Sequence, residues 1–206
     1  MQIISHRGYW KSKAERNTRI AFERSFDLGF GTELDVRDYQ GRLVIAHDMA
    51  IGDEMSLDEL LLLMDGRQLP LAVNIKADGL VESVRASFEH HGHRNWFVFD
   101  MSVPDMRAYL AAGVRTFSRM SEVERQPAYL ERCAGIWLDA FEGGWYDAAL
   151  LEMLLESERM VCVVSDELHG RPPERQWALL GQFASYENLL LCTDFPEQAT
   201  SCLMKS

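Results

Sequence analysis

Two kinds of segment alternate along the chain in its hydrophobic pattern. Short apolar runs predict buried strands, and longer stretches with apolar residues at helical spacing predict amphipathic helices. The predicted strands are Ile3–Ser5, Thr32–Val36 with a hairpin partner at Leu43–Ala46, Leu71–Ile75, Trp96–Phe99, Thr116–Ser118, Gly135–Leu138, Val161–Val164 and Leu189–Cys192. The predicted helices are Asn17–Leu28, Ser56–Met64, Leu80–His91, Val103–Ala112, Glu122–Arg132, Asp147–Ser157, Glu174–Phe183 and a tail from Pro196 to Met204.

Residues typical of helix ends support several of these boundaries. Asn17 and Ser56 are suited to cap helix N-termini, and Glu59 completes a capping box with Ser56. Asp194 and Glu197 resemble a second capping box before the tail helix. Glycines stand where three helices are expected to stop, at Gly29, Gly92 and Gly113.

Strands that alternate with helices indicate a parallel sheet built from βαβ units. With the hairpin counted as an extension of the second strand there are eight such units, and eight units close into a (β/α)₈ TIM barrel. A doubly wound open sheet fits the same pattern less well. No long linker, low-complexity tract or repeat divides the chain, so we expect one domain over residues 1–206.

Composition and charge restrict the classes of partner. The 206 residues are 47% hydrophobic and 26% charged, which is typical of a soluble globular protein. A net charge of −11 argues against nucleic acid and against adsorption to anionic membranes. The first strand starts too early for a signal peptide, and no apolar run is long enough for membrane insertion. The four cysteines lack Cys-x-x-Cys spacing, and Cys162 and Cys192 fall in apolar strands. We therefore expect reduced thiols and a cytoplasmic protein.

Polar side chains gather where the predicted strands end, which is the edge of a barrel that carries chemistry. Glu33 and Asp35 are two residues apart on a strand, so both carboxylates face the same side. Two adjacent acids repel each other unless a cation lies between them, so this spacing suggests a divalent metal with oxygen ligands. The hairpin strand brings His47 beside them. A half-buried strand followed by a solvated hairpin is the alternative interpretation.

Several motifs, in order along nearly the whole chain, resemble those of the glycerophosphodiester phosphodiesterase family. The matching motifs are His6-Arg7-Gly8, Asn17-Thr18 followed by Ala21-Phe22, Glu33-Leu34-Asp35-Val36, Val44-Ile45-Ala46-His47-Asp48, Ile75-Lys76 and Thr193-Asp194-Phe195-Pro196. The resemblance implies a metal-dependent TIM barrel of the phospholipase C-like phosphodiesterase type. It implies hydrolysis of a small phosphodiester to an alcohol and a phosphomonoester, with Mg²⁺ or Ca²⁺ as cofactor.

The resemblance also implies roles for individual residues. Glu33 and Asp35 are the expected metal ligands, and Arg7 and Lys76 neutralise charge on the phosphate. His6 and His47 share the roles of base, or nucleophile, and acid, each worth about 10²–10⁴-fold in rate, and the sequence leaves open which does which. The attacking group is either water or a hydroxyl of the substrate itself. In the second case the enzyme is a lyase that releases a cyclic phosphate.

Three departures from the family pattern affect these expectations. Asn74 stands where the family has its third metal-binding glutamate, so Asn74 contributes an uncharged ligand, or Asp100 or Asp139 replaces it. Arg16 stands where the family usually has a glutamate, and the family's inserted subdomain after the His-Asp turn is missing. A catalytically silent relative that binds a phosphorylated ligand is therefore the alternative function.

Two further groups of residues are candidates for binding. His169, and with it Arg171, follows the seventh predicted strand, where barrels commonly contact phosphate, so we expect His169 to bind the far side of the substrate. The run His90-His91-Gly92-His93 resembles a metal motif, but it is typical of a helix C-terminus, which is the interpretation we favour.

Overall fold

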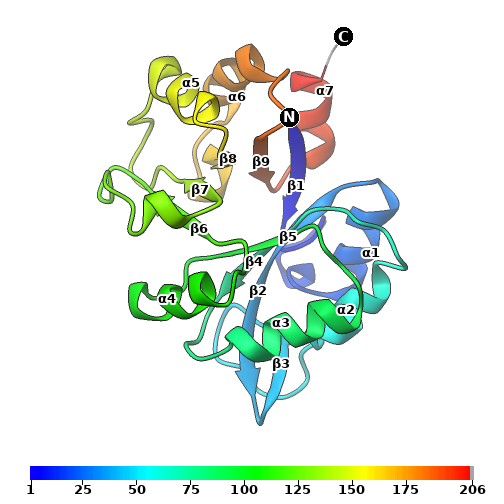
Figure 1. The fold of residues 1–206 in the computed structure, drawn as a ribbon. Helices are drawn as coiled ribbons and strands as arrows, with labels where there is room; N and C mark the ends of the chain where they lie inside the picture. The colour runs from blue at the N-terminus through cyan, green and yellow to red at the C-terminus, as the bar shows by residue number, and fades with distance from the viewer. Residues whose placement is uncertain (205–206) are drawn as a thin grey trace. The chain divides into compact units, whose positions relative to one another are not determined.

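The computed structural model describes residues 1–204, and these form two compact units (Figure 1). The N-terminal unit holds residues 5–116, and the C-terminal unit holds residues 1–4 together with the chain from Phe117 onward. Strand β1, Gln2–His6, runs from one unit into the other. The predicted domain extends to residue 206, whose last two residues lie outside the described part of the chain. That these residues form a single domain stays a prediction.

The N-terminal unit is built on three parallel strands and one antiparallel partner. Strand β4 pairs in parallel with both β2 and β5, and β3 pairs with β2 as a hairpin. The strands are β2 (Gly31–Tyr39), β3 (Arg42–Ile45), β4 (Leu71–Ile75) and β5 (Trp96–Phe99), and the helices are η1 (Lys13–Glu15), α1 (Arg19–Asp27), α2 (Leu57–Leu63), α3 (Val81–His90) and α4 (Val103–Ala111). Gln40 and Gly41 both have positive φ, which matches the tight turn expected between β2 and β3.

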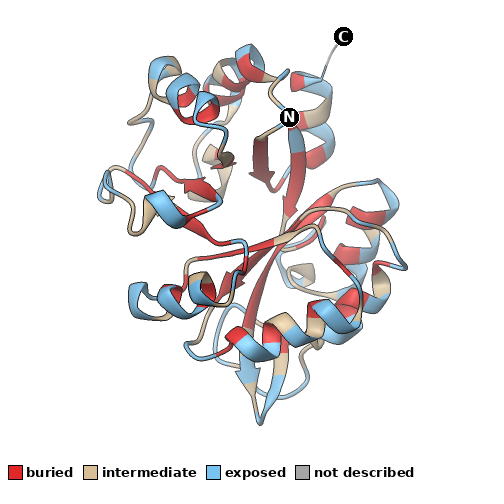
Figure 2. Ribbon diagram, viewed as in Figure 1, coloured by how far each residue is buried: buried red, intermediate tan, exposed pale blue. Residues whose placement is uncertain are grey.

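The C-terminal unit repeats the strand–helix alternation. Its strands β6 (Phe117–Met120), β7 (Gly135–Leu138), β8 (Met160–Val164) and β9 (Leu189–Thr193) are parallel and adjacent in that order. The other elements are η2 (Leu130–Arg132), α5 (Ala148–Glu156), η3 (Asp166–His169), α6 (Glu174–Leu180), η4 (Gly181–Phe183) and α7 (Pro196–Leu203). In Figure 2 the strands of both units are mostly buried, while each α-helix has both buried and exposed residues.

All eight predicted strands are present, and most helix ends agree with the sequence signals. Ser56 and Glu59 form the reciprocal capping box: the Glu59 N–H donates to Ser56 Oγ (3.2 Å), and the Ser56 N–H donates to Glu59 Oε2 (2.8 Å). The glycines expected at helix ends all have left-handed φ angles, at Gly29, Gly92 and Gly113. Cys162 and Cys192 are fully buried, as predicted, and neither belongs to a disulfide.

Three predictions about helices are wrong. Residues 122–132 do not form an α-helix and end in the short 3₁₀ helix η2, because Pro127 cannot donate a backbone hydrogen bond and Tyr129 adopts a left-handed φ of 53°. Asn17 is not the cap of α1, since Thr18 occupies that position and Asn17 itself has a φ of 57°. The second capping box is also absent: Phe195 precedes α7 and Pro196 starts it.

Two further features of the sequence are settled by the fold. Helix α3 ends at His90, so the histidine run lies at a helix C-terminus as predicted; His91 Nε2 pairs with Asp58 Oδ1 at 3.2 Å, and His93 is buried.

No helix among residues 1–204 has the length and apolar character needed to cross a membrane.

Candidate active site

The paired stretch of β2 and β4, with the residue that follows β4, places four polar side chains together in the N-terminal unit. Asp35 lies opposite Asn74 in the strand register, and Lys76 follows β4 directly, where its N–H donates to the Val36 carbonyl at 2.8 Å. Glu33 is 2% exposed, Asp35 is fully buried and Asn74 is 7% exposed. The period-two alternation of a strand thus puts both acids on one side, as the sequence predicted.

Asp35 is the centre of a network of charged and polar side chains. Arg7 Nε lies 3.0 Å from its Oδ2, and Lys76 Nζ lies 3.1 Å from its Oδ1. Asn17 Nδ2 donates a hydrogen bond to Oδ2 at 2.9 Å. Burial raises the pKa of Asp35, but the two cations and Asn17 outweigh burial and hold this pKa below its usual range. Asp35 is therefore an anion that holds the two basic side chains in place.

Glu33 has the opposite electrostatic environment. Burial, followed by repulsion from Asp35, raises the pKa of Glu33 to about 8, and Arg7 and Lys76 offset only part of that rise. His6 Nε2 lies 3.9 Å from Glu33 Oε2. The first predicted histidine is thus beside the first predicted metal ligand.

The turn after β1 sets the position of Arg7. Arg7 has a left-handed φ of 59°, its N–H donates to the Glu33 carbonyl at 3.0 Å, and its own carbonyl accepts from the Asn17 N–H at 3.0 Å. Gly8 has a φ of 80°, and a Cβ on Gly8 would lie only 2.7 Å from the Ala21 Cβ. Strained backbone of this kind commonly marks functional sites.

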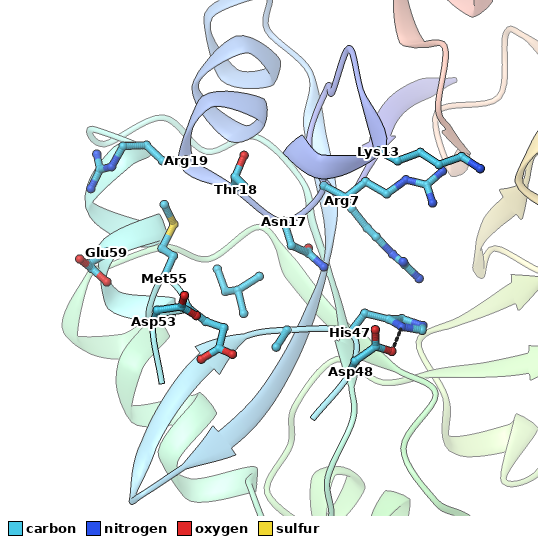
Figure 3. A pocket seen from close by; sticks show the side chains of 14 residues that line it. Arg7, Lys13, Asn17, Thr18, Arg19, His47, Asp48, Asp53, Met55 and Glu59 are labelled. Carbon is cyan, nitrogen blue, oxygen red and sulfur yellow. Dashed lines mark hydrogen bonds and ion pairs between the residues drawn. The ribbon is translucent and has the colours of Figure 1, made fainter. Parts of the chain in front are cut away.

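A pocket of about 700 Å³ opens beside this network and holds the second predicted histidine. His47 follows β3, its side chain is 45% exposed, and its Nδ1 lies 2.9 Å from Asp48 Oδ1. In Figure 3, His47 and Asp48 lie toward the same end of the pocket as Arg7 and Lys13, with Arg19 and Glu59 at the other end. Arg7 and Asn17 line the pocket, so His47 shares it with two side chains that contact Asp35.

The donor set of the N-terminal unit fits a hard divalent cation. Glu33 Oε2 and Asn74 Oδ1 are buried oxygens without a hydrogen-bond partner among the described residues, and Asp35 Oδ1 pairs with Lys76 Nζ at 3.1 Å. Carboxylate and amide oxygens are the ligands that Mg²⁺ and Ca²⁺ prefer, and a bound cation would offset the burial and the repulsion from Asp35 that disfavour the ionised form of Glu33. Within residues 1–204, however, no three His, Cys, Asp or Glu side chains converge, because the third position is Asn74.

The remaining predicted residues belong to the C-terminal unit or to other strand ends. Asp139 Oδ1 lies 2.7 Å from His169 Nε2, and the Phe141 ring packs edge-on against His169. Asp100 follows β5 with a φ of 62°. That Asp139 or Asp100 replaces Asn74 as a ligand, and that His169 contacts substrate, stay predictions.

Sequence reasoning missed four side chains of this site. Asn17 belongs to one of the motifs, but its position before α1 suggested a helix cap rather than a hydrogen bond to Asp35. Lys13, Arg16 and Arg19 line the pocket and make one wall basic. Arg16, which also stacks on the Trp10 ring at 4.3 Å, was noticed only as a departure from the family motif.

Comparison with solved structures identifies the fold. A glycerophosphodiester phosphodiesterase from Agrobacterium tumefaciens matches with a TM-score of 0.73 at 18% identity, covering 100% of each chain. A phosphodiesterase from Oleispira antarctica, solved in complex with the product sn-glycerol-3-phosphate, matches with a TM-score of 0.74 at 16% identity, covering 100% of this chain and 97% of that one. A Ca²⁺-dependent phosphatidylinositol-specific phospholipase C from Streptomyces antibioticus matches with a TM-score of 0.55 at 12% identity, covering 98% and 95%.

No protein-family model and no curated protein matches the sequence, so the likeness is one of structure. It covers the chain from end to end, and it confirms the predicted fold class. The chain has the (β/α)₈ TIM-barrel fold of the glycerophosphodiester phosphodiesterases.

Proposed function

We propose that the chain is a metal-dependent phosphodiesterase that hydrolyses a small phosphodiester to an alcohol and a phosphomonoester. The observation that carries this proposal is the buried pair Glu33 and Asp35, held beside His6, Arg7 and Lys76 in a fold shared with enzymes of that activity. The Oleispira antarctica relative, which holds sn-glycerol-3-phosphate as its product, supports a glycerol-based substrate.

Glu33, Asp35 and Asn74 are the residues that would hold the metal, Mg²⁺ or Ca²⁺. Bound there, the cation supplies a Lewis acid for a phosphoryl oxygen. The likeness to a Ca²⁺-dependent phospholipase C supports a divalent metal. With Asn74 in place of a carboxylate, the set carries two negative charges rather than three, so we expect weak metal binding.

Arg7 and Lys76 bind the phosphate and stabilise the negative charge that grows during the reaction. Both side chains are positioned by Asp35 before substrate arrives, at 3.0 and 3.1 Å, so little reorganisation is needed. Such preorganised charges commonly supply the largest part of an enzyme's rate enhancement.

His6 and His47 transfer the protons. In hydrolysis, water attacks phosphorus and the bond from phosphorus to the leaving oxygen breaks. One histidine takes the proton of the attacking water, and the other gives a proton to the departing alcohol. His6 is held next to Glu33, and His47, held by Asp48, faces the solvent-filled pocket. Which imidazole serves as base stays open.

The second candidate is a catalytically silent protein that binds a phosphate ester. It is favoured by Asn74 at the third ligand position and by the two basic side chains already paired with Asp35. Calorimetric titration with Mg²⁺ and Ca²⁺ separates the candidates. Divalent binding in the millimolar range or tighter supports the enzyme; no metal binding, with retained binding of glycerol phosphate, supports the silent relative.

Turnover of a simple aryl phosphodiester tests the proposed activity itself. We expect hydrolysis with added Mg²⁺ or Ca²⁺, loss of activity with chelator, and losses of about 10²-fold or more in His6→Ala and in His47→Ala. His90→Ala is the matched control, because His90 ends α3 and does not line this pocket. Full activity in both His6→Ala and His47→Ala contradicts the proposal.

A further inference from the structure

Two large apolar side chains are strongly exposed next to the proposed active site. Met49 is 86% exposed and Ile51 is 77% exposed, the highest values among the exposed large hydrophobic residues of the described chain. Both lie in the segment Met49–Gly52, called the rim loop here, which follows His47 and Asp48 directly. Burying either side chain against an apolar ligand is favourable, because it removes hydrophobic surface from water.

The rim loop is held in one conformation by specific contacts. The Glu54 carboxylate accepts the Ile51 N–H at 2.6 Å and the Gly52 N–H at 2.8 Å. Gly52 has a φ of 111°, and a Cβ there would lie 2.9 Å from the Tyr39 ring. Met49 and Ile51 are therefore presented to solvent by an ordered backbone, so a ligand that contacts them meets a preformed surface.

The rim loop is continuous with the active-site pocket. Asp48 and Asp53, the residues immediately before and after the rim loop, both line the pocket, so the rim loop lies at the border of the pocket. The pocket also has apolar lining on the same stretch of chain, from Ile45, Ala46 and Met55. Figure 3 shows Met55 among the side chains that line the pocket. Apolar side chains of this stretch thus lie both at the pocket, at Ala46 and Met55, and in the rim loop, at Met49 and Ile51, with acidic residues between them.

The other segment that lines the pocket is basic, whereas residues 45–55 contribute the carboxylates Asp48, Asp53 and Glu54 as well as apolar side chains. Four basic side chains come from the turn after β1 and the start of α1: Arg7, Lys13, Arg16 and Arg19. A ligand that satisfies both segments carries a negative charge on one part and a hydrocarbon on another. A small, fully polar phosphodiester leaves the rim loop without a contact.

We infer that the substrate is a single-chain lipid phosphodiester, whose phosphate is bound at the basic side chains and whose hydrocarbon chain lies along Met55, Met49 and Ile51. This inference rests on the proposed phosphodiesterase function and names its substrate class. The rim loop acts as a specificity element: it lowers KM for substrates with a chain and leaves the reaction at phosphorus unchanged.

Binding of alkyl phosphates below their critical micelle concentrations tests the inference independently of turnover. Ethyl phosphate and octyl phosphate are titrated calorimetrically, with Mg²⁺ present, into the wild-type protein, the double variant Met49→Ser/Ile51→Ser and the control Met153→Ser. Met153 is a 57% exposed methionine on α5, remote in sequence from the pocket lining. We expect octyl phosphate to bind the wild type and the control at least about tenfold more tightly than ethyl phosphate, and this ratio to fall to about threefold or less in the double variant.

A turnover arm separates failure of the inference from failure of the proposed function. The substrates are sn-glycero-3-phosphocholine and its 1-octanoyl derivative, both monomeric. Equal kcat/KM for the two diesters overturns the inference and leaves the phosphodiesterase standing. No turnover of either diester, with the octyl preference retained in binding, overturns hydrolysis and supports the lipid site. In a last experiment the protein is sedimented with phosphatidylcholine vesicles. If it co-sediments with the vesicles but binds monomeric octyl phosphate no more tightly than ethyl phosphate, the rim loop binds a membrane surface and the inference is overturned.

Discussion

Lys76 Nζ lies 3.1 Å from Asp35 Oδ1, at the point where the parallel pairing of β2 with β4 ends. This ion pair joins a buried acid to a cation that is 21% exposed, with Arg7 against the other carboxylate oxygen. The result is a charged centre in which the anion is buried and both cations reach toward solvent. That arrangement suits recognition of a second anion, such as a phosphate.

Replacing Lys76 with methionine removes one of these cations while keeping an unbranched apolar stem. We expect kcat/KM for a phosphodiester to fall by about 10²–10³-fold, because a preorganised positive charge is lost. Lys11→Met is the control, since Lys11 contacts the Tyr9 ring and does not line the pocket. Steady-state kinetics of both variants measure the effect, and equal activity in Lys76→Met and Lys11→Met rules out a role for Lys76 in catalysis.

Restoring a charged oxygen at residue 74 tests the proposed metal site. Asn74→Asp adds a carboxylate of nearly the same size beside Glu33 and Asp35, so we expect divalent cations to bind at least about tenfold more tightly. Without metal, a third buried acid destabilises the fold, so the variant should unfold at lower urea unless Mg²⁺ or Ca²⁺ is present. Calorimetry and urea unfolding give the two readouts. Unchanged metal affinity would place the metal elsewhere.

Metal binding should release a proton from Glu33. Its pKa is raised to about 8 by burial and by Asp35, so at pH 7 the metal-free carboxyl is largely protonated and must ionise to become a ligand. Apparent affinity therefore rises with pH through about 8 and is flat above that value. Calorimetry at pH 7 in buffers of different ionisation enthalpy counts the proton, and Glu33→Gln provides the reference. A release of zero protons in the wild type contradicts this description of Glu33.

The turn that carries Arg7 should not tolerate a side chain at Gly8. A Cβ there meets Ala21 at 2.7 Å in a left-handed conformation, so Gly8→Ala should lower the free energy of unfolding by about 2–4 kcal/mol. At Gly29, φ is almost the same, at 79°, and a Cβ meets nothing within 4 Å. Gly29→Ala should therefore cost only about 1 kcal/mol, for the backbone alone. Similar urea midpoints for the two variants would show that the Ala21 contact is relieved by small shifts.

Strand periodicity and strand order were enough to predict the core of this site. Glu33 and Asp35 share a face because strand side chains alternate, and Lys76 reaches Asp35 because it follows the stretch of β4 that pairs in parallel with β2. The eight strands followed from apolar runs whose burial the fold requires. These are local or nearest-neighbour relationships, which a sequence pattern specifies directly.

What the sequence did not predict depends on backbone conformation or on distant contacts. Asn17 hydrogen-bonds Asp35 only because residues 7 and 17 both take left-handed φ angles. The ion pair between His91 and Asp58 joins residues on different helices. The α-helix absent from residues 122–132 is different, because Pro127 within that stretch is itself a sequence signal against an α-helix.

Phosphorus NMR of a reaction with sn-glycero-3-phosphocholine, with and without divalent metal, tests the central claim most directly. We predict a single phosphomonoester product that forms in Mg²⁺ or Ca²⁺, is absent with chelator, and forms at least about 10²-fold more slowly in His6→Ala. A cyclic phosphate as the final product would make the protein a lyase. Unchanged diester at every metal concentration, from a protein that still binds glycerol phosphate, would contradict the claim that this site is an enzyme's.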